Sequence, residues 1–145
     1  MATPKQRQKT RRLLVQALYS WDLGGCDLAT IEAEFHVDNN MSKADVEFFH
    51  EVLYAIPKQL SQIDAHYSEH LDRTVAELDP ISRAVLRLAS YEFAERLDVP
   101  YKVVINEGVN LAKTFGPTDA YKYINGVLDK VAAQLRSAEF EANIR

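Results

Sequence analysis

Cysteine, glycine and proline are scarce in this 145-residue sequence, and long apolar runs are missing. The single cysteine, Cys26, excludes an intramolecular disulfide, as is usual for a protein of the reducing cytoplasm. Five Gly and five Pro exclude a collagen-like or low-complexity chain. Because no run of about 18 apolar residues exists, we expect no transmembrane helix and no membrane partner. The charged N-terminus lacks the apolar segment of a signal peptide, so we expect a cytoplasmic globular protein of one domain.

Acidic residues are missing from the first 21 positions. Those positions carry five Lys and Arg, whereas the remainder of the chain carries 12 Lys and Arg against 21 Asp and Glu. The net charge of −4 therefore conceals a basic arm on an acidic body. This distribution is typical of a protein that contacts nucleic acid or another acidic partner, although a solubilising terminus would carry the same charge.

Alternation of apolar and polar residues at period two is nearly absent, and apolar residues recur at steps of three and four. This pattern predicts an all-α protein. Gly24 and Gly25 are expected to end the first helix, Pro57 to interrupt the third, and Asp79-Pro80 to start a helix. The expected helices are Lys5–Leu23, Leu28–Phe35, a third that Ser42 and Asp45 cap and that reaches Ile56, Leu60–Tyr67, Pro80–Glu95, Lys102–Thr114, and a last one from Thr118 or Asp119 to about residue 136.

A break near residues 71–79 divides the chain into two helical halves, about 5–71 and about 79–136. Each half is too small to be predicted as an independent domain, so one domain over 1–145 is expected. The helix that begins at Pro80 has apolar residues around much of its circumference, which predicts a central, buried helix. Residues 137–145 are expected to form a frayed tail.

One face of the first helix combines positive charge with a tyrosine. Basic side chains neutralise phosphates, and an exposed ring can stack on an unpaired base. A side-chain amide can form a hydrogen bond with a base edge. The combination favours single-stranded RNA over duplex DNA, and the competing interpretation is a solvated basic face with a half-buried tyrosine. The face comprises Lys5, Lys9, Arg12, Gln16 and Tyr19, at steps of four, three, four and three, with Arg7 and Arg11 in a flanking row.

The start of the last expected helix has a similar composition, with Tyr121, Lys122 and Tyr123 in its first turns. Lys122 and Tyr123 lie off the expected buried stripe, and a helix N-terminus attracts phosphate through its free amides. Asp119 opposes such binding and is a candidate cap for the helix. Tyrosines on helices also commonly lie at the edge of the core, so a structural role stays open here.

The segment His66-Tyr67-Ser68-Glu69-His70 matches the H-x-x-E-H pattern of inverted zinc peptidases. Histidines four residues apart share one helical face, where they can bind zinc, which makes a zinc-dependent hydrolase an alternative function. No third ligand can be identified, and two surface histidines give the same pattern. Because the sequence has no phosphate-binding loop, no dinucleotide motif and no C-x-x-C pair, we expect no catalytic residue, no metal and no cofactor.

Three blocks of sequence carry a family resemblance. The first is V-Q-A-L-Y-S-W at 15–21, and the second is A-V-L-R-L-A-S-Y-E at 84–92. The third begins with D-V-P-Y-K-V-V-I-N-E at 98–107 and continues through L-A-K-T-F-G at 111–116 to N-G-V-L-D-K at 125–130. In this order, and over essentially the whole chain to about residue 136, the sequence resembles the NusB family of bacterial transcription antitermination factors.

The resemblance implies a fold and a function. The fold is one compact all-α domain of about seven helices in two small bundles. The function is binding of the single-stranded boxA element of ribosomal RNA leader transcripts, together with the ribosomal protein NusE. This complex joins RNA polymerase and other Nus factors, and the family is not enzymatic. Because some members self-associate, the resemblance leaves both a monomer and a homodimer open.

The resemblance also assigns roles to residues of the N-terminal arm. Arg7, Lys9 and Arg11 match the arginine-rich N-terminus of the family, and Tyr19 falls in the matching Q-A-L-Y-S-W block, where it would stack on or hydrogen-bond a nucleotide. Two glutamines and a threonine interrupt the basic run in this chain. The individual phosphate contacts are therefore open.

A second RNA contact is implied before the N-G-V-L-D-K block, where Asp119, Lys122 and Tyr123 match the family segment. The protein partner is expected on the second helical half, at about Asp79–Lys113. The remaining alternative is a helical scaffold that binds only proteins, with a basic arm that merely keeps the chain in solution.

Overall fold

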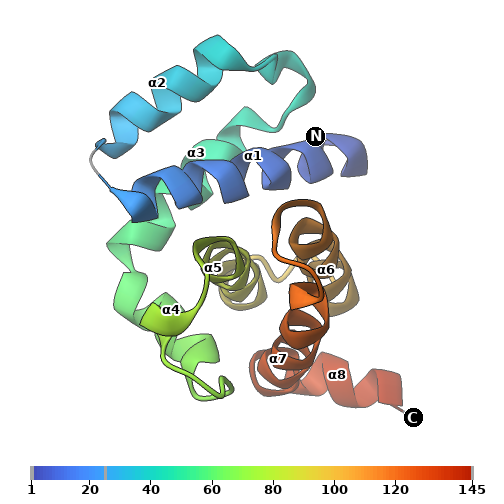
Figure 1. The fold of residues 1–145 in the computed structure, drawn as a ribbon. Helices are drawn as coiled ribbons and strands as arrows, with labels where there is room; N and C mark the ends of the chain where they lie inside the picture. The colour runs from blue at the N-terminus through green and yellow to red at the C-terminus, as the bar shows by residue number, and fades with distance from the viewer. Residues whose placement is uncertain (1, 25, 145) are drawn as a thin grey trace.

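The computed structural model describes residues 2–24 and 26–144 and contains no strand over them (Figure 1). The predicted all-α class is confirmed. Gly25, one of two glycines expected to end the first helix, lies outside the described residues. The helices are α1 (Pro4–Leu23), α2 (Leu28–Asp38), α3 (Val46–Lys58), α4 (Leu60–Ser68), α5 (Pro80–Glu95), α6 (Tyr101–Phe115), α7 (Ala120–Leu135) and α8 (Ser137–Ile144), with the 3-10 turns η1 (Met41–Lys43) and η2 (Val75–Glu77).

Local sequence signals set the ends of several helices. Before α1, the Thr3 hydroxyl accepts from the Gln6 amide at 3.1 Å and the Gln6 side chain accepts from the Thr3 amide at 2.8 Å. This reciprocal pair is a capping box. Gly24 follows α1 with φ 102°, a conformation that favours glycine. Asp79 caps α5 by accepting from the Ser82 amide at 2.9 Å, so the predicted start of this helix is confirmed.

The central helix is α5, which contacts α1, α3, α4, α6 and α7. Every residue from Ala84 to Phe93 is buried, so α5 has no solvent-exposed face over these three turns. Figure 1 shows α1 crossing over the bundle formed by α5, α6 and α7. Apolar side chains from both halves of the chain join in one core cluster. None of the described helices is long and apolar enough to cross a membrane.

Close approach between α6 and α7 depends on Gly108. A Cβ atom at this position would lie 2.7 Å from Leu128 Cδ1 and 3.7 Å from Val85 Cγ1. The first distance is shorter than van der Waals contact, so any side chain here would displace Leu128 from its place in the core. Glycine therefore lets α6 lie close to both α5 and α7.

The expected frayed tail is wrong for residues 137–144, which form α8. The Arg136 side chain is buried and donates to the backbone carbonyls of Phe93 at 2.8 Å, Arg96 at 2.9 Å and Val99 at 2.9 Å. A guanidinium carries five donors in a planar fork, so it can satisfy several orphan carbonyls at the end of one helix. Arg136 thereby joins the C-terminus of α7 to the C-terminus of α5.

The first turn of α8 is held by three further contacts, made by Glu139 and Phe140. Glu139 accepts from Arg136 at 2.8 Å and from the Tyr101 amide at 2.9 Å, which places its carboxylate at the start of α6. The Phe140 ring lies 5.3 Å from the Tyr101 ring. An eight-residue helix is marginal in water by itself, so these tertiary contacts explain both why α8 is ordered and why periodicity did not predict it.

Candidate nucleic-acid interface

The N-terminal half of α1 and the turn η1 form a shallow cationic groove of about 330 Å³, called here the α1–η1 groove. Its basic residues come from two parts of the chain, and none of the described residues that line it is a carboxylate. The Lys9 ammonium donates to the Asn40 carbonyl at 2.7 Å, which fixes the distance between α1 and η1. Positive charge without local acids favours phosphate. The lining residues are Thr3, Lys5, Gln6, Lys9, Arg12, Ser42 and Lys43.

Sequence reasoning missed Lys43, because no helical period connects it with α1. Lys43 is exposed and lies at the end of η1. One signal was present: Lys43 is the only lysine or arginine between Arg12 and Lys58. That isolation marks the residue as unusual, but only the fold brings it beside Lys5 and Lys9.

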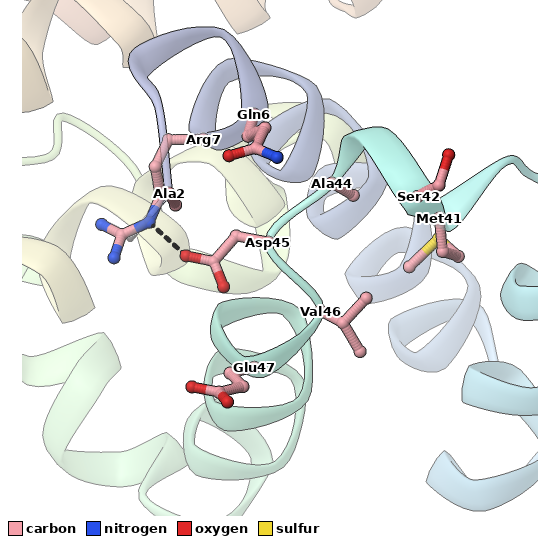
Figure 2. Close-up of a pocket in the computed structure, with 9 residues that line it drawn as sticks. All are labelled: Ala2, Gln6, Arg7, Met41, Ser42, Ala44, Asp45, Val46 and Glu47. Carbon is pink, nitrogen blue, oxygen red and sulfur yellow. Dashed lines mark hydrogen bonds and ion pairs between the residues drawn. The ribbon is translucent and has the colours of Figure 1, made fainter.

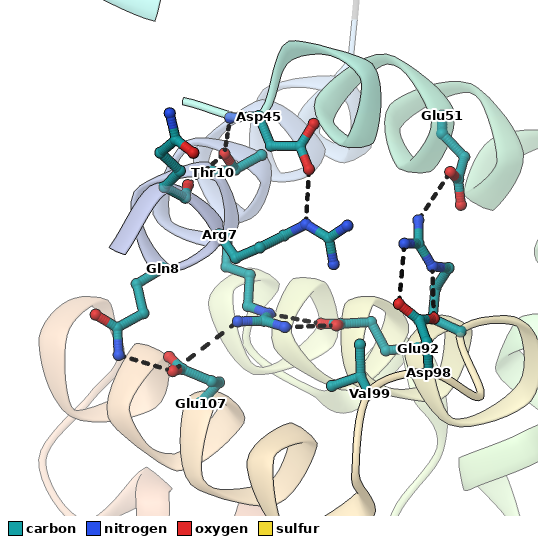
Figure 3. A network of polar contacts seen from close by, with 12 residues as sticks. Arg7, Gln8, Thr10, Asp45, Glu51, Glu92, Asp98, Val99 and Glu107 are labelled. Atoms are coloured by element: carbon teal, nitrogen blue, oxygen red, sulfur yellow. Dashed lines mark hydrogen bonds and ion pairs between the residues drawn. The ribbon is translucent and has the colours of Figure 1, made fainter. Parts of the chain in front are cut away.

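The flanking row of the first helix does not contribute to the exposed cationic surface. Arg11 has only 3% of its surface exposed, and its guanidinium donates to Glu92 at 2.9 and 2.8 Å. Glu107 lies 3.9 Å away and also accepts from Gln8 at 3.0 Å (Figure 3). Burial alone would lower the pKa of Arg11, but the hydrogen bond to Glu92 and the two negative charges outweigh burial and raise this pKa. Arg11, which the resemblance matches to the RNA-binding N-terminus of the family, is therefore buried in an ion pair and does not belong to the accessible surface.

Arg7 is also engaged within the protein. Its Nε donates to Asp45 at 2.7 Å (Figure 3). Its guanidinium also lies 4.3 Å from the centroid of the Phe48 ring. Asp45 in turn caps α3 by accepting from the Phe48 amide at 3.1 Å, and its own amide donates to the Thr10 hydroxyl at 2.7 Å. Arg7 thus ties α1 to the start of α3, and only part of its side chain reaches solvent.

A second and larger groove, of about 650 Å³ (Figure 2), shares Gln6 and Ser42 with the α1–η1 groove. Its lining includes the Arg7–Asp45 pair and the Glu47 carboxylate, which leaves no excess of positive charge. Apolar residues Met41, Ala44 and Val46 supply much of the remaining wall. We therefore assign phosphate binding to the smaller α1–η1 groove, because charge and not volume decides affinity for RNA.

Gln16 and Tyr19 continue the basic face of α1 toward its C-terminus. Both are exposed, and the exposed fraction of Tyr19 is 36%. Gln16 donates to the Arg12 carbonyl at 3.0 Å through its side-chain nitrogen, so its side-chain oxygen can serve as an acceptor. The structure thus brings Lys5, Lys9, Arg12, Gln16 and Tyr19 to one accessible side of α1, with Lys9 only partly exposed.

Tyr123, expected to contact a base, is held by the loop that follows α4. Its hydroxyl donates to Asp72 Oδ1 at 2.9 Å and accepts from the Asp72 amide at 3.1 Å. The Arg73 guanidinium lies 4.6 Å from the ring centroid. Hydrogen bonds from Arg73 and Tyr123 lower the pKa of Asp72 to about 2, and partial burial raises the pKa of Tyr123. In this conformation the hydroxyl links α7 to the loop, and the Arg73 guanidinium covers one face of the half-buried ring.

The other two residues of the implied second contact are exposed. Asp119 has φ 67° and occupies the N-cap position of α7, but its side chain accepts no helix amide. Its expected capping role is therefore wrong. The carboxylate lies 3.6 Å from the Lys122 ammonium instead. Because both groups are largely in solvent, this pair contributes little stability and leaves Lys122 available to a ligand.

The histidine pair does not have the geometry that the zinc alternative requires. Helix α4 ends at Ser68, so His70 lies in the following turn and not one helical turn beyond His66. The His70 ring contacts Gln134 at 3.0 Å and lies 3.6 Å from Glu69. Within residues 2–24 and 26–144, no three His, Cys, Asp or Glu side chains are grouped closely enough to hold a metal ion.

Comparisons with known proteins agree with the sequence resemblance. A model of the NusB family matches residues 8–133. "Transcription antitermination protein NusB" of Teredinibacter turnerae is 52% identical over 141 residues, covering 97% of this chain and 96% of the relative. The protein of the same name from Saccharophagus degradans is 55% identical over 137 residues, covering 94% of this chain and 91% of the relative.

The fold agrees as well. The solved structure of T. maritima NusB superposes with a TM-score of 0.79 at 28% identity, covering 97% of this chain and 99% of the other. The family model, the two relatives and the solved structure each cover most of this chain. The chain therefore belongs to the NusB family.

Proposed function

We propose that this protein is a transcription antitermination factor that binds single-stranded boxA RNA of ribosomal RNA leader transcripts. One observation carries the RNA part of the proposal: four cationic side chains line the α1–η1 groove, and none of the described lining residues is acidic. The names of the relatives carry the antitermination part. The protein would act in the cytoplasm by assembly and not as an enzyme, and it would need no cofactor.

Different residues of the α1 surface would bind the phosphates and the bases of the RNA. Lys5, Lys9, Arg12 and Lys43 would hold the phosphate backbone, which gives affinity without reading sequence. Tyr19 would stack on an unpaired base, and the Gln16 side-chain oxygen would accept from a base edge. Sequence preference would therefore come from the C-terminal part of the α1 face, and charge-driven affinity from the N-terminal part.

A protein partner would supply the remaining specificity. We propose the ribosomal protein NusE, bound on the second helical half between Asp79 and Lys113, with RNA polymerase and other Nus factors joining the assembly. Because α5 is buried, the accessible apolar positions of this stretch are few: Leu97 is 70% exposed and Val103 38% exposed. These two side chains are suited to an apolar contact with the partner. Self-association to a homodimer would instead hide the RNA surface.

The test is a titration of a boxA-type RNA and a scrambled RNA of equal length, with and without NusE, at two salt concentrations. Preferential boxA binding that NusE strengthens is the expected result. Salt-sensitive binding without preference would reduce the function to a basic arm. Absence of RNA binding in every condition would favour the protein-binding scaffold, and the solution mass would reveal whether a homodimer hides the α1 surface.

A further inference from the structure

The larger groove beside the α1–η1 groove combines apolar and acidic side chains (Figure 2). Met41 and Ala44 form its buried wall, with 9% of each residue exposed, and Val46 is 39% exposed. Gln6 comes from α1, and Glu47 comes from the first turn of α3. We call this site the Glu47 groove.

Glu47 and Gln6 each bring an unused polar group to this groove. Among the described residues, no hydrogen bond or ion pair within 4.0 Å engages the Glu47 carboxylate, and the side chain is exposed. The Gln6 side-chain oxygen accepts from the Thr3 amide at 2.8 Å, and no described acceptor holds its side-chain nitrogen. Asp45, by contrast, already pairs with Arg7. The groove therefore offers one free carboxylate and one free donor.

The position of Glu47 in α3 explains its charge only in part. A carboxylate in the first turn of a helix is favoured by the helix dipole, and Glu47 lies in that turn. The dipole requires a negative charge near the helix end, but it requires neither an apolar wall nor a neighbouring cationic groove. Binding of a nucleotide base would use all three features.

We propose that the Glu47 groove is a subsite for a guanine base, with the Glu47 carboxylate accepting from the N1 imino and N2 amino groups of the base. The inference rests on the proposed function, since it assumes a single-stranded RNA ligand. Unpaired bases of RNA are read along their Watson–Crick edges, and among the four bases guanine alone carries two adjacent donors there. Two donors match the two oxygens of one carboxylate, and hydrogen bonds to a charged acceptor are the strong ones. Met41 and Val46 would contact the face of the ring, and the Gln6 side-chain nitrogen would donate to an acceptor of the same nucleotide.

The neighbouring cations give the nucleotide a direction. The Glu47 groove and the α1–η1 groove share Gln6 and Ser42, so the two are contiguous. A phosphate is attracted by Lys5 and Lys43 and repelled by Glu47, so the phosphate would lie in one groove and the base in the other. This arrangement adds base reading to the N-terminal end of the surface, where the face of α1 alone supplies only charge.

The experiment measures binding of the full chain to two fluorescently labelled RNAs, a uridine oligomer and the same oligomer with one central guanosine. Wild-type protein is expected to bind the guanosine oligomer about tenfold tighter, which is within the discrimination of a bidentate contact with a base edge. Glu47→Gln keeps the volume and removes one of the two acceptors, so the two affinities should then agree within about twofold. Inosine, which lacks the N2 amino group, should lower the preference of the wild type and leave that of Glu47→Gln unchanged.

The matched control is Glu34→Gln, because Glu34 is an exposed glutamate of α2 outside both grooves and its substitution makes the same change of charge. It should retain the guanosine preference. If the wild type shows no such preference, or if Glu47→Gln keeps the wild-type ratio of the two affinities, the subsite is wrong and the α1 surface stands. If the wild type binds neither oligomer nor the boxA-type RNA, the proposed function falls, and this inference falls with it.

A second readout on the wild type covers the case in which Glu47→Gln fails to fold, which circular dichroism would reveal. The guanosine is replaced by 6-thioguanosine, which cross-links to contacting side chains under ultraviolet light, and the cross-linked peptides are identified by mass spectrometry. Cross-links at Gln6 or within residues 41–47 support the subsite. Cross-links confined to other residues, such as Tyr19, overturn it.

Discussion

The two rows of basic residues on α1 have different structural roles. Lys5, Lys9 and Arg12 line a groove without described acidic residues, whereas Arg7 and Arg11 are neutralised by carboxylates from other parts of the chain. All five lie within three turns of one helix. A count of charges along a helix therefore overestimates the surface that can bind a ligand, because some of the charged side chains form ion pairs that hold the fold together.

The carboxylates that decide between the two roles are distant in sequence. Asp45 follows Arg7 by 38 residues, and Glu92 follows Arg11 by 81. A guanidinium suits a buried position because its planar fork can pair with both oxygens of one carboxylate, as Arg11 does with Glu92. A lysine offers no such fork, and the two lysines of α1 both belong to the groove.

The largest expected effect comes from a substitution that breaks the buried ion pair of the flanking row. Arg11→Met would leave the Glu92 carboxylate, only 2% exposed, without its ion-pair partner. Removing one member of a buried pair costs about 3–5 kcal/mol, so we expect a loss of that size in the free energy of unfolding, measured by urea titration. The matched change in the exposed row, Arg12→Met, should alter stability by less than about 0.5 kcal/mol. Equal losses for the two variants would contradict the division into rows.

The next effect concerns the exposed row alone. Tyr19→Ala should weaken boxA binding by about 1–3 kcal/mol, because it removes the ring proposed to stack on a base. Tyr19→Phe keeps the ring and should retain affinity. Fluorescence titration gives the affinities, and circular dichroism shows whether each variant is folded. Unchanged boxA affinity in folded Tyr19→Ala would remove Tyr19 from the RNA surface.

Acid should weaken the Arg7–Asp45 ion pair of the flanking row, whereas the described lining of the α1–η1 groove has no carboxylate to protonate. Burial acts to raise the pKa of Asp45, but the hydrogen bond from Arg7 and the amide of Phe48 outweigh burial and lower it. A carboxylate whose pKa is lower in the folded than in the unfolded protein stabilises the fold at pH values above its unfolded pKa, near 4. This stabilisation is lost as the pH falls through the pKa of the folded protein. We therefore expect wild-type stability to fall below about pH 4.

Asp45→Asn tests this pH dependence. The variant should be less stable than the wild type at neutral pH, and it should lose less of its remaining stability on acidification. The measurement is a series of urea titrations from neutral pH downward. Parallel pH curves for the two proteins would show that the Arg7–Asp45 pair is not a source of the acid response.

The smallest expected effect is a change of salt dependence. Lys43→Gln should reduce the slope of log K against log salt by about 0.7, as expected for one lost phosphate contact. Arg7→Gln should leave the slope unchanged, because its charge is already paired with Asp45. RNA titrations over a salt series measure both slopes. A reduced slope for Arg7→Gln would place the flanking row in contact with RNA after all.

Much of the fold could be predicted from local signals. Asp79-Pro80, Gly24 and the three- and four-residue spacing of apolar side chains predicted the starts, ends and buried faces of helices that the structure confirms. These signals act within one or two turns, so they can be read along the chain. Helix α8 was missed because its order depends on Arg136, Glu139 and Phe140 meeting residues of α5 and α6.

The candidate site divides in the same way. The helical period by itself determined that Lys5, Lys9, Arg12, Gln16 and Tyr19 share one accessible side of α1, because side chains three and four residues apart are neighbours on a helix.

Only the tertiary structure decided that Arg11 is buried, that Lys43 joins the groove and that Tyr123 is held by Asp72. The physical reason is the range of the interactions. Backbone periodicity is local, whereas charge pairing and burial depend on side chains that folding brings together from distant parts of the chain.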